Sequence, residues 1–165
     1  MTKATVLHTY YTNEVTEEVL RELRKAPFTE EQLATFDPAV SEELRRNHAE
    51  MLSRPVMGIR RIVAEGSQSR LGGKVIKGTS GMTITLDGGV EVAVARKGDP
   101  VQYPDGSVSF IATGAGKGHS NIALVGSLLD NGDEIINTSQ SACLLVMYEG
   151  HVWDSDFLPK DGAEE

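Results

Sequence analysis

Residues 57–149 constrain the fold most strongly, because short apolar segments alternate there with glycines and a six-residue pattern recurs. The three occurrences are Gly66–Leu71, Gly98–Tyr103 and Thr138–Cys143. The first and third share Ser-Gln-Ser, and the first and second share a glycine followed by a small polar residue that can cap a turn. Imperfect recurrence of this kind indicates one structural unit used several times, around an axis or along a stack.

Composition narrows the class of protein. The chain has 165 residues, enough for one domain with a real core or for a small domain and an arm. Only 5% of the residues are aromatic, so we expect a core of Val, Ile, Leu and Ala. The net charge of −8 argues against nucleic acid as a general partner, since phosphate binding needs clustered Lys and Arg.

Cysteine content and hydropathy bear on the compartment. One cysteine cannot form an internal disulfide, which indicates a reducing compartment. No apolar run approaches the roughly 20 residues of a membrane span, so we expect no stable membrane insertion. Residues 1–8 lack the long apolar region of a secretory signal, so we expect a cytoplasmic protein without a signal peptide.

Residues 1–56 are predicted to form a helical N-terminal extension. Thr12-Asn13 is predicted to start a first helix that Pro27 ends, with apolar side chains on one face. Thr29 opens a capping box for a short second helix, and Asp37-Pro38 supplies a cap and a first-turn proline for a third. Two roles stay open: an arm packed on its neighbour, or a docking module whose apolar stripes a partner covers.

Residues 57–149 are predicted to form short strands joined by tight turns. Apolar residues alternate with threonines around Ile84, Asp87-Gly88-Gly89 is a hairpin turn, and Val90–Val94 alternate as the return strand. Asp130-Asn131-Gly132 is another hairpin turn, and Leu144–Tyr148 reads as a last strand. Strands this short, separated by glycines, suit a compact, tapered arrangement in which backbones approach closely.

A family signature lies within this region. Ala93-Val94-Ala95-Arg96-Lys97-Gly98-Asp99 resembles the Pro-Ala-Ala-Arg-x-Gly-Asp signature of the PAAR family. These are the small cone-shaped proteins that sharpen the spikes of type VI secretion systems and related contractile phage tails. The resemblance covers about residues 57–149 and includes the Asp87-Gly88-Gly89 turn, the three hexapeptides and Leu71–Ile76 in the family's order.

The resemblance implies both a fold and a function. The fold is mainly β: a small conical domain of short β-hairpins with pseudo-threefold symmetry over residues 57–149, with the helical arm 1–56 before it and an acidic tail 150–165 after it. The function is non-enzymatic. The protein would cap a trimeric spike, of the valine-glycine-repeat or phage-hub type, in a contractile injection machine that punctures membranes and delivers effectors.

Further expectations follow from that function. A monomer caps a trimer only by imitating its symmetry. The helical arm would carry an effector or chaperone, and the protein would leave the cell at the tip of the injection machine. Whether that machine is a secretion system or a phage-like particle stays open.

The resemblance also implies zinc near the point of the cone, held by histidines and one cysteine at the hexapeptide ends. The ends here are Leu71, Tyr103 and Cys143. His119 lies where the family often places another histidine, so only His119 and Cys143 are ligand types, whereas a closed zinc site needs four donors. Either Asp99 or Asp105 completes a zinc site, or packing of Leu71 and Tyr103 holds a metal-free apex. We expect the second, with no required cofactor.

The hairpin ends opposite the hexapeptides are predicted to meet the spike. Small turns there permit close backbone approach, and the aliphatic residues beside them supply the buried part of an interface. The predicted contact residues are Leu86, Asp87, Gly88, Val90, Leu128, Leu129, Asn131 and Gly132.

Two other classes of function stay open. In a small hydrolase or transferase, Cys143 and His119 would serve as nucleophile and base. Against this, Cys143 precedes an apolar run and suits an inert, packed thiol. A β-rich binding module unrelated to injection is the other class. Two places also stay open for Trp153 and Phe157 of the tail, on the β domain or on the helical arm.

Overall fold

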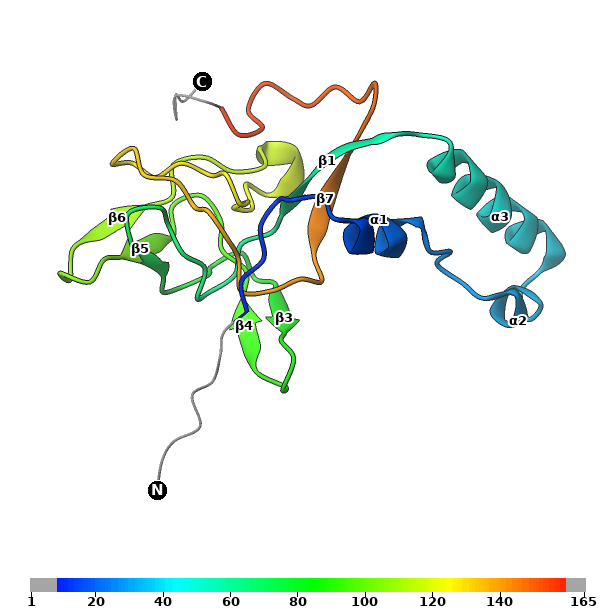
Figure 1. The fold of residues 1–165 in the computed structure, drawn as a ribbon, viewed down its shortest axis with the longest axis horizontal. Helices are drawn as coiled ribbons and strands as arrows, with labels where there is room; N and C mark the ends of the chain where they lie inside the picture. The colour runs from blue at the N-terminus through cyan, green and yellow to red at the C-terminus, as the bar shows by residue number, and fades with distance from the viewer. Residues whose placement is uncertain (1–8, 160–165) are drawn as a thin grey trace. The chain divides into compact units, whose positions relative to one another are not determined.

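The computed structural model describes residues 9–159, which form three α-helices, one 3-10 helix and seven short strands (Figure 1). The helices are α1 (Glu17–Arg24), α2 (Glu30–Leu33), α3 (Pro38–Leu52) and the 3-10 helix η1 (Lys117–His119). The strands are β1 (Val56–Arg61), β2 (Lys74–Val75), β3 (Thr83–Thr85), β4 (Glu91–Ala93), β5 (Pro100–Gln102), β6 (Val108–Phe110) and β7 (Leu144–Tyr148). The chain is therefore mixed α and β, and the expectation of a mainly β protein holds only loosely. No helix within residues 9–159 has the length and apolar character needed to cross a bilayer.

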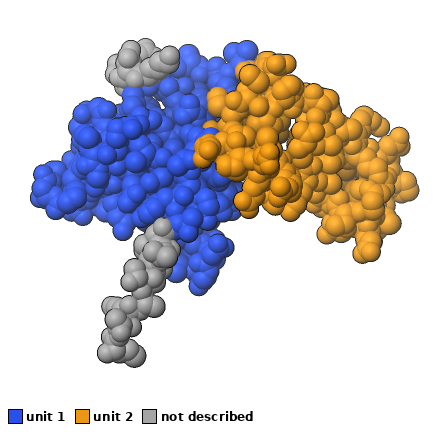
Figure 2. Space-filling model, viewed as in Figure 1, with its two compact units in different colours: residues 1–13, 60–145, 152–165 blue, residues 14–59, 146–151 orange. Residues whose placement is uncertain are grey.

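The chain divides into two compact units (Figure 2). One, here called the β unit, contains residues 1–13, 60–145 and 152–165; the helical unit contains residues 14–59 and 146–151. In the helical unit, Thr29 forms the predicted capping box with Gln32, and Asp37 caps α3. His48 Nε2 lies 2.9 Å from the carbonyl oxygen of Arg24, so this histidine has a structural partner.

The first helix starts later than predicted. Its N-cap is Thr16, whose side chain accepts a hydrogen bond from the Val19 amide, and not Thr12-Asn13. The reason lies in the β unit, where Asn13 is already engaged: its Nδ2 donates to the carbonyl of Val125 at 2.8 Å, and its Oδ1 accepts the amide of Arg61 at 2.8 Å. A side chain used in tertiary hydrogen bonds cannot also cap a helix.

The strands form three small antiparallel sheets. These are the pair β1-β7, the three-stranded sheet β2-β5-β6 and the hairpin β3-β4. The predicted alternation is confirmed in β3, where Ile84 is buried between two exposed threonines. The predicted hairpin turn is confirmed as well: Ile84 pairs with Val92, and Gly88 and Gly89 both adopt positive φ.

Three segments of the β unit repeat one local structure. We call them copy 1 (residues 62–76), copy 2 (94–112) and copy 3 (122–136). Each contains a glycine with positive φ, namely Gly66 at 94°, Gly98 at 98° and Gly126 at 108°. The residue that follows each glycine is small, polar and buried: Ser67, Asp99 and Ser127. Only glycine adopts this backbone conformation without strain, so it marks the true repeat.

The third copy is therefore not the predicted hexapeptide Thr138–Cys143. Its counterpart of Gly66–Leu71 is Gly126–Asn131, whereas Thr138 has no glycine-like conformation. Thr138 instead donates its hydroxyl to the carbonyl of Ile62 at 2.9 Å. Residues 139–141 match Ser67-Gln68-Ser69 in amino-acid type but not in backbone conformation.

A closed ring of backbone hydrogen bonds joins the three copies. Val63 donates to Ala123 at 2.9 Å, Ala123 donates to Ala95 at 3.0 Å, and Ala95 donates to Val63 at 2.9 Å. The flanking β-bridges follow the same cycle: Ile62 with Leu124, Ala64 with Val94, and Arg96 with Ile122. The copies are thus related as three members of one ring, each bonded to the other two.

Each copy then folds back as a hairpin beside the ring. The three glycine amides donate to equivalent carbonyls: Gly66 to Val75 at 2.9 Å, Gly98 to Ile111 at 2.8 Å and Gly126 to Ile135 at 2.8 Å. Eight residues lie between Gly66 and Val75 and eight between Gly126 and Ile135, but twelve lie between Gly98 and Ile111. The second hairpin, β5-β6, therefore reaches further than the other two.

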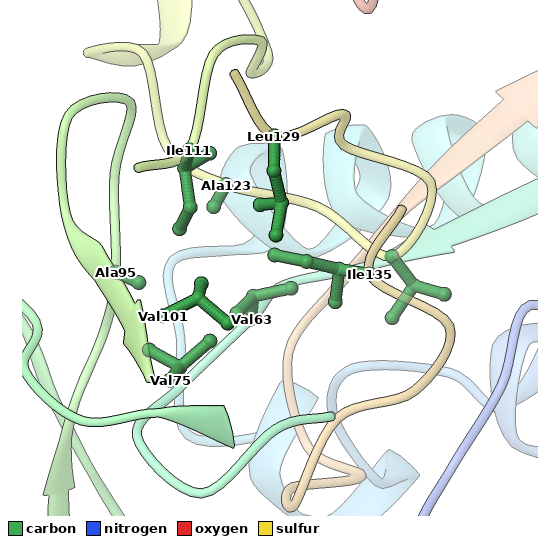
Figure 3. Close-up of a cluster of buried hydrophobic side chains, with 9 residues drawn as sticks. Val63, Val75, Ala95, Val101, Ile111, Ala123, Leu129 and Ile135 are labelled. Atoms are coloured by element: carbon green, nitrogen blue, oxygen red, sulfur yellow. The ribbon is translucent and has the colours of Figure 1, made fainter. Parts of the chain in front are cut away.

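The first core cluster lies between the ring and the hairpins (Figure 3). Its buried residues are Val63, Val75, Ala95, Val101, Ile111, Ala123, Val125, Leu129 and Ile135. Most of them are threefold equivalents. Val125 has no counterpart in the cluster. At the position three residues after each glycine, copies 2 and 3 have Val101 and Leu129 but copy 1 has Ser69, which is also buried. One polar group therefore interrupts the apolar core.

Candidate functional site

Three hairpin turns meet at one end of the β unit, which we call the tip. The position five residues after each glycine holds Leu71, Tyr103 and Asn131. Leu71 and Tyr103 both contact the turn of copy 3: the Leu71 amide donates to Asp133 Oδ1 at 3.2 Å, and Asn131 Nδ2 donates to the Tyr103 hydroxyl at 3.0 Å.

Asp133 is the centre of these contacts. Its carboxylate is buried and accepts the hydroxyl of Tyr103 at 2.6 Å. Burial alone would raise the pKa of Asp133, but hydrogen bonds from Ser69, Tyr103 and the amides of Glu134 and Leu71 outweigh it and hold this pKa below the ordinary 3.8. Burial and the bond to Asp133 raise the pKa of Tyr103 above 10.0. The tip is thus an ionised carboxylate surrounded by donors.

The tip does not fit a zinc ion. Leu71 has no donor atom, and it is 67% exposed. The Tyr103 hydroxyl is protonated and donates to Asp133, and a protonated phenol is a poor zinc ligand. Within residues 9–159, no three His, Cys, Asp or Glu side chains gather as a metal site would require. The contacts that join the hairpins at the tip are the hydrogen bonds of Asp133, Tyr103, Asn131 and the Leu71 amide.

The two predicted metal ligands lie away from the tip. Cys143 packs against the second core cluster, which contains Ile62, Ile84, Val94, Ala115 and Leu124. Its backbone is held by Gln140, whose side chain accepts the Cys143 amide at 2.7 Å. His119 is exposed, and its ring lies 5.7 Å from the ring of Trp153. No hydrogen bond links His119 to Cys143 in the part of the chain that the structure describes.

The second core cluster defines the other end of the β unit, which we call the base. Neighbouring residues of an extended strand point to opposite faces, so Ile62 and Val63, or Val94 and Ala95, face opposite sides of the ring. Val63 and Ala95 belong to the first cluster and Ile62 and Val94 to the second. The ring therefore separates the tip side from the base side.

A small pocket opens at the base. Its volume is about 150 Å³, and it is lined by Ile62, Ala115, His119, Ser120, Ile122, Leu124 and Leu145. The lining is mainly aliphatic and includes the threefold equivalents Ile62 and Ile122. His119 supplies the main ionisable group at the rim.

The predicted spike-contact residues fall into two groups. Leu86, Asp87, Gly88 and Val90 lie in the β3-β4 hairpin, which points in a different direction from the β5-β6 hairpin of the tip (Figure 1). Asn131 and Gly132 lie at the tip itself, because Asn131 contacts Tyr103. Leu129 is only 3% exposed in the first core cluster, and Leu128 pairs beside it with Glu134. The premise that both turns lie opposite the hexapeptide ends is wrong for the second turn.

Sequence reasoning missed Asp133 and Ser69, on which the tip depends. A signal existed for the third copy: Ile122-Ala123-Leu124-Val125-Gly126-Ser127 matches Ile62–Ser67 in three apolar positions, the glycine and the serine, and differs where Val125 stands opposite Glu65. Aligning these two segments would have placed Asn131 opposite Leu71. Nothing in the sequence alone marks Asp133 as buried.

Comparison of the chain with family models, with curated proteins and with solved structures found no match.

We predict that Tyr103→Phe destabilises the β unit by about 1–2 kcal/mol, because it removes one donor from a buried carboxylate. Urea unfolding measures the change. Tyr148→Phe is the matched control, since it removes the same hydroxyl outside the tip. Equal stability of the two variants would show that the Tyr103–Asp133 bond contributes nothing.

Asp133 should give the β unit a characteristic acid sensitivity. The pKa of Asp133 is lower in the folded protein than its ordinary 3.8, so its contribution is complete above that value and disappears as the pH falls through the lowered folded pKa. We predict that Asp133→Asn lowers stability by about 1–3 kcal/mol at pH 7, and that the difference from wild type shrinks below pH 4. Unfolding curves between pH 7 and pH 2 test this, with the exposed Asp87→Asn as control. A difference independent of pH contradicts the assignment.

We also predict that the tip keeps its structure without zinc. Protein purified without chelator should contain far less than one zinc per chain by elemental analysis, and added EDTA should leave the melting temperature unchanged. One tightly held zinc per chain, lost in Cys143→Ala, would overturn this prediction.

Proposed function

We propose that this protein is a non-enzymatic spike-tip protein that caps a trimeric β-helical spike of a contractile injection machine. The observation that carries the proposal is the closed ring formed by Val63, Ala95 and Ala123. One chain that covers the end of a trimer must offer similar backbone to each of three subunits. A ring of three equivalent segments in a single chain meets that requirement.

The position of the PAAR-like signature supports the proposal. Ala93–Asp99 spans the ring residue and the glycine of copy 2. Ala95 is the ring residue, Gly98 is the glycine with positive φ, and Asp99 is the buried residue that follows it. Asp99 accepts the amides of Arg96 and Thr79, which ties copy 2 to the connection that precedes it. The residues that resemble the signature are therefore ones that hold the ring and the turn of copy 2 together.

The base is the end that we assign to the spike. Its apolar residues are available, since Val90 is 60% and Met82 44% exposed on the β3-β4 hairpin. The small aliphatic pocket lies on the same side of the ring. At the tip, in contrast, Asp133, Tyr103 and Asn131 are bonded to one another.

The helical unit is the part that we assign to cargo, either an effector or a chaperone. Val40 and Leu52 are exposed on α3 and Val15 is exposed just before α1, and only Leu33 and Ser41 are buried within the helices of this unit. A partner helix or groove would cover such apolar side chains. On this proposal the protein leaves the cell with the injection machine.

Mixing the protein with valine-glycine-repeat spike trimers of the source organism tests the proposal. We predict a complex with one chain per trimer, measured by analytical ultracentrifugation. Val90→Asp should weaken it at least tenfold, because a charge placed in an apolar interface lacks a partner.

Leu71→Asp is the matched control, because Leu71 is a similarly exposed aliphatic residue at the tip, 67% against 60% for Val90. It should leave binding unchanged. Loss of binding in Leu71→Asp but not in Val90→Asp would show that the opposite end contacts the spike. No complex at all with the wild-type chain would refute the proposal.

A further inference from the structure

The connections between the copies differ in length although they start from equivalent places. Gly78 and Gly114 both follow their hairpins and lie against carbonyl oxygens at the start of the next copy: those of Ala93 and Val94 for Gly78, and those of Asn121 and Ile122 for Gly114. Fifteen residues lie between Gly78 and Val94 and include the β3-β4 hairpin, whereas only seven lie between Gly114 and Ile122. The second connection has no hairpin.

The C-terminal segment lies against this short connection. Residues 152–158, here called the strap, are bonded to it at two points: the Leu158 amide donates to the carbonyl of Gly114 at 2.8 Å, and the Lys117 amide donates to Asp156 Oδ2 at 2.9 Å. The ring of Trp153 stacks on Phe157 at 4.3 Å and lies beside His119. Trp153 and Phe157 therefore take the first of their two predicted places, on the β unit.

The short connection is shaped to receive the strap. Gly116 has φ of 86°, and a Cβ there would overlap the carboxylate of Asp156. Glycine thus supplies both the backbone conformation and the space. Phe157 and Leu158 continue onto the second core cluster, the cluster that defines the base.

We propose that the strap takes the place of the missing second hairpin and forms part of the surface that contacts the spike. The inference rests on the proposed function, in which the base meets a trimer. One subunit of the trimer then contacts the β3-β4 hairpin, and another contacts the strap. Half-buried Trp and Phe side chains, here Trp153 and Phe157, are the residue types that contribute most to protein interfaces.

The first test removes the strap. A chain ending at His151 is compared with a control chain ending at Pro159 for binding to the spike trimer, and amide hydrogen exchange at Val63, Ala95 and Ala123 reports on the ring. We expect the shorter chain to keep slow exchange in the ring and to bind at least tenfold more weakly, while the control binds like the full chain.

The second test displaces the strap without shortening the chain. Gly116→Ala places a methyl group against Asp156, whereas Gly132→Ala introduces similar backbone strain, at φ of 88°, with no atom within 4 Å of the new Cβ. We expect Gly116→Ala alone to speed exchange of the Lys117 amide and to weaken binding to the trimer. Asp156→Ala should do the same, and Asp154→Ala, which removes an equal charge without that bond, should not.

The outcomes separate this inference from the proposed function. If the full chain does not bind the trimer, the proposed function fails and this inference with it. If the full chain binds and the strapless chain binds equally well, only the inference fails. Tighter binding without the strap also overturns it, because the strap would then cover the contact surface. Weaker binding of the strapless chain and of Gly116→Ala, with an intact ring, supports it.

Discussion

The structure of the β unit depends on the cycle of hydrogen bonds through Val63, Ala95 and Ala123. An open sheet leaves unpaired backbone groups along its edges, and these attract other strands. A three-membered cycle of short segments has no such edge at its centre. Closure requires that all three segments keep one conformation, which is why a left-handed glycine recurs at Gly66, Gly98 and Gly126.

A closed ring tolerates unequal connections. The connection between copies 1 and 2 carries a hairpin, and the connection between copies 2 and 3 is short and receives the strap. The chain that follows copy 3 is held by Gln140, which bonds to Cys143. Loop length costs little free energy once the ends are fixed, so evolution can lengthen or shorten each connection without opening the ring. Symmetry is therefore confined to the centre, while the surface of the base differs on its three sides.

Sequence signals that act within a few residues predicted local structure well. Features that depend on contacts between distant residues were not predicted. The capping box at Thr29 and the turn at Asp87-Gly88-Gly89 act within a few residues, and both formed as predicted. Helix α1 starts at Thr16 because Asn13 bonds to residues far away in sequence. The third copy was misplaced because a repeat of conformation, set by glycine, need not repeat the same letters.

At the tip, the backbone of the three copies is similar but the side chains differ. The three hairpins follow one backbone plan, but only copy 1 has a buried serine three residues after its glycine, and Asp133 of copy 3 accepts a hydrogen bond from it. A buried carboxylate is costly unless donors surround it, and the turns of all three copies converge to supply them. Leu71 gives an amide, Tyr103 a hydroxyl and Ser69 another. Because these donors belong to copies 1 and 2 and Asp133 belongs to copy 3, Asp133 can be satisfied only when the three hairpins are correctly placed. Hydrogen bonding to one ionised group thus specifies the tip.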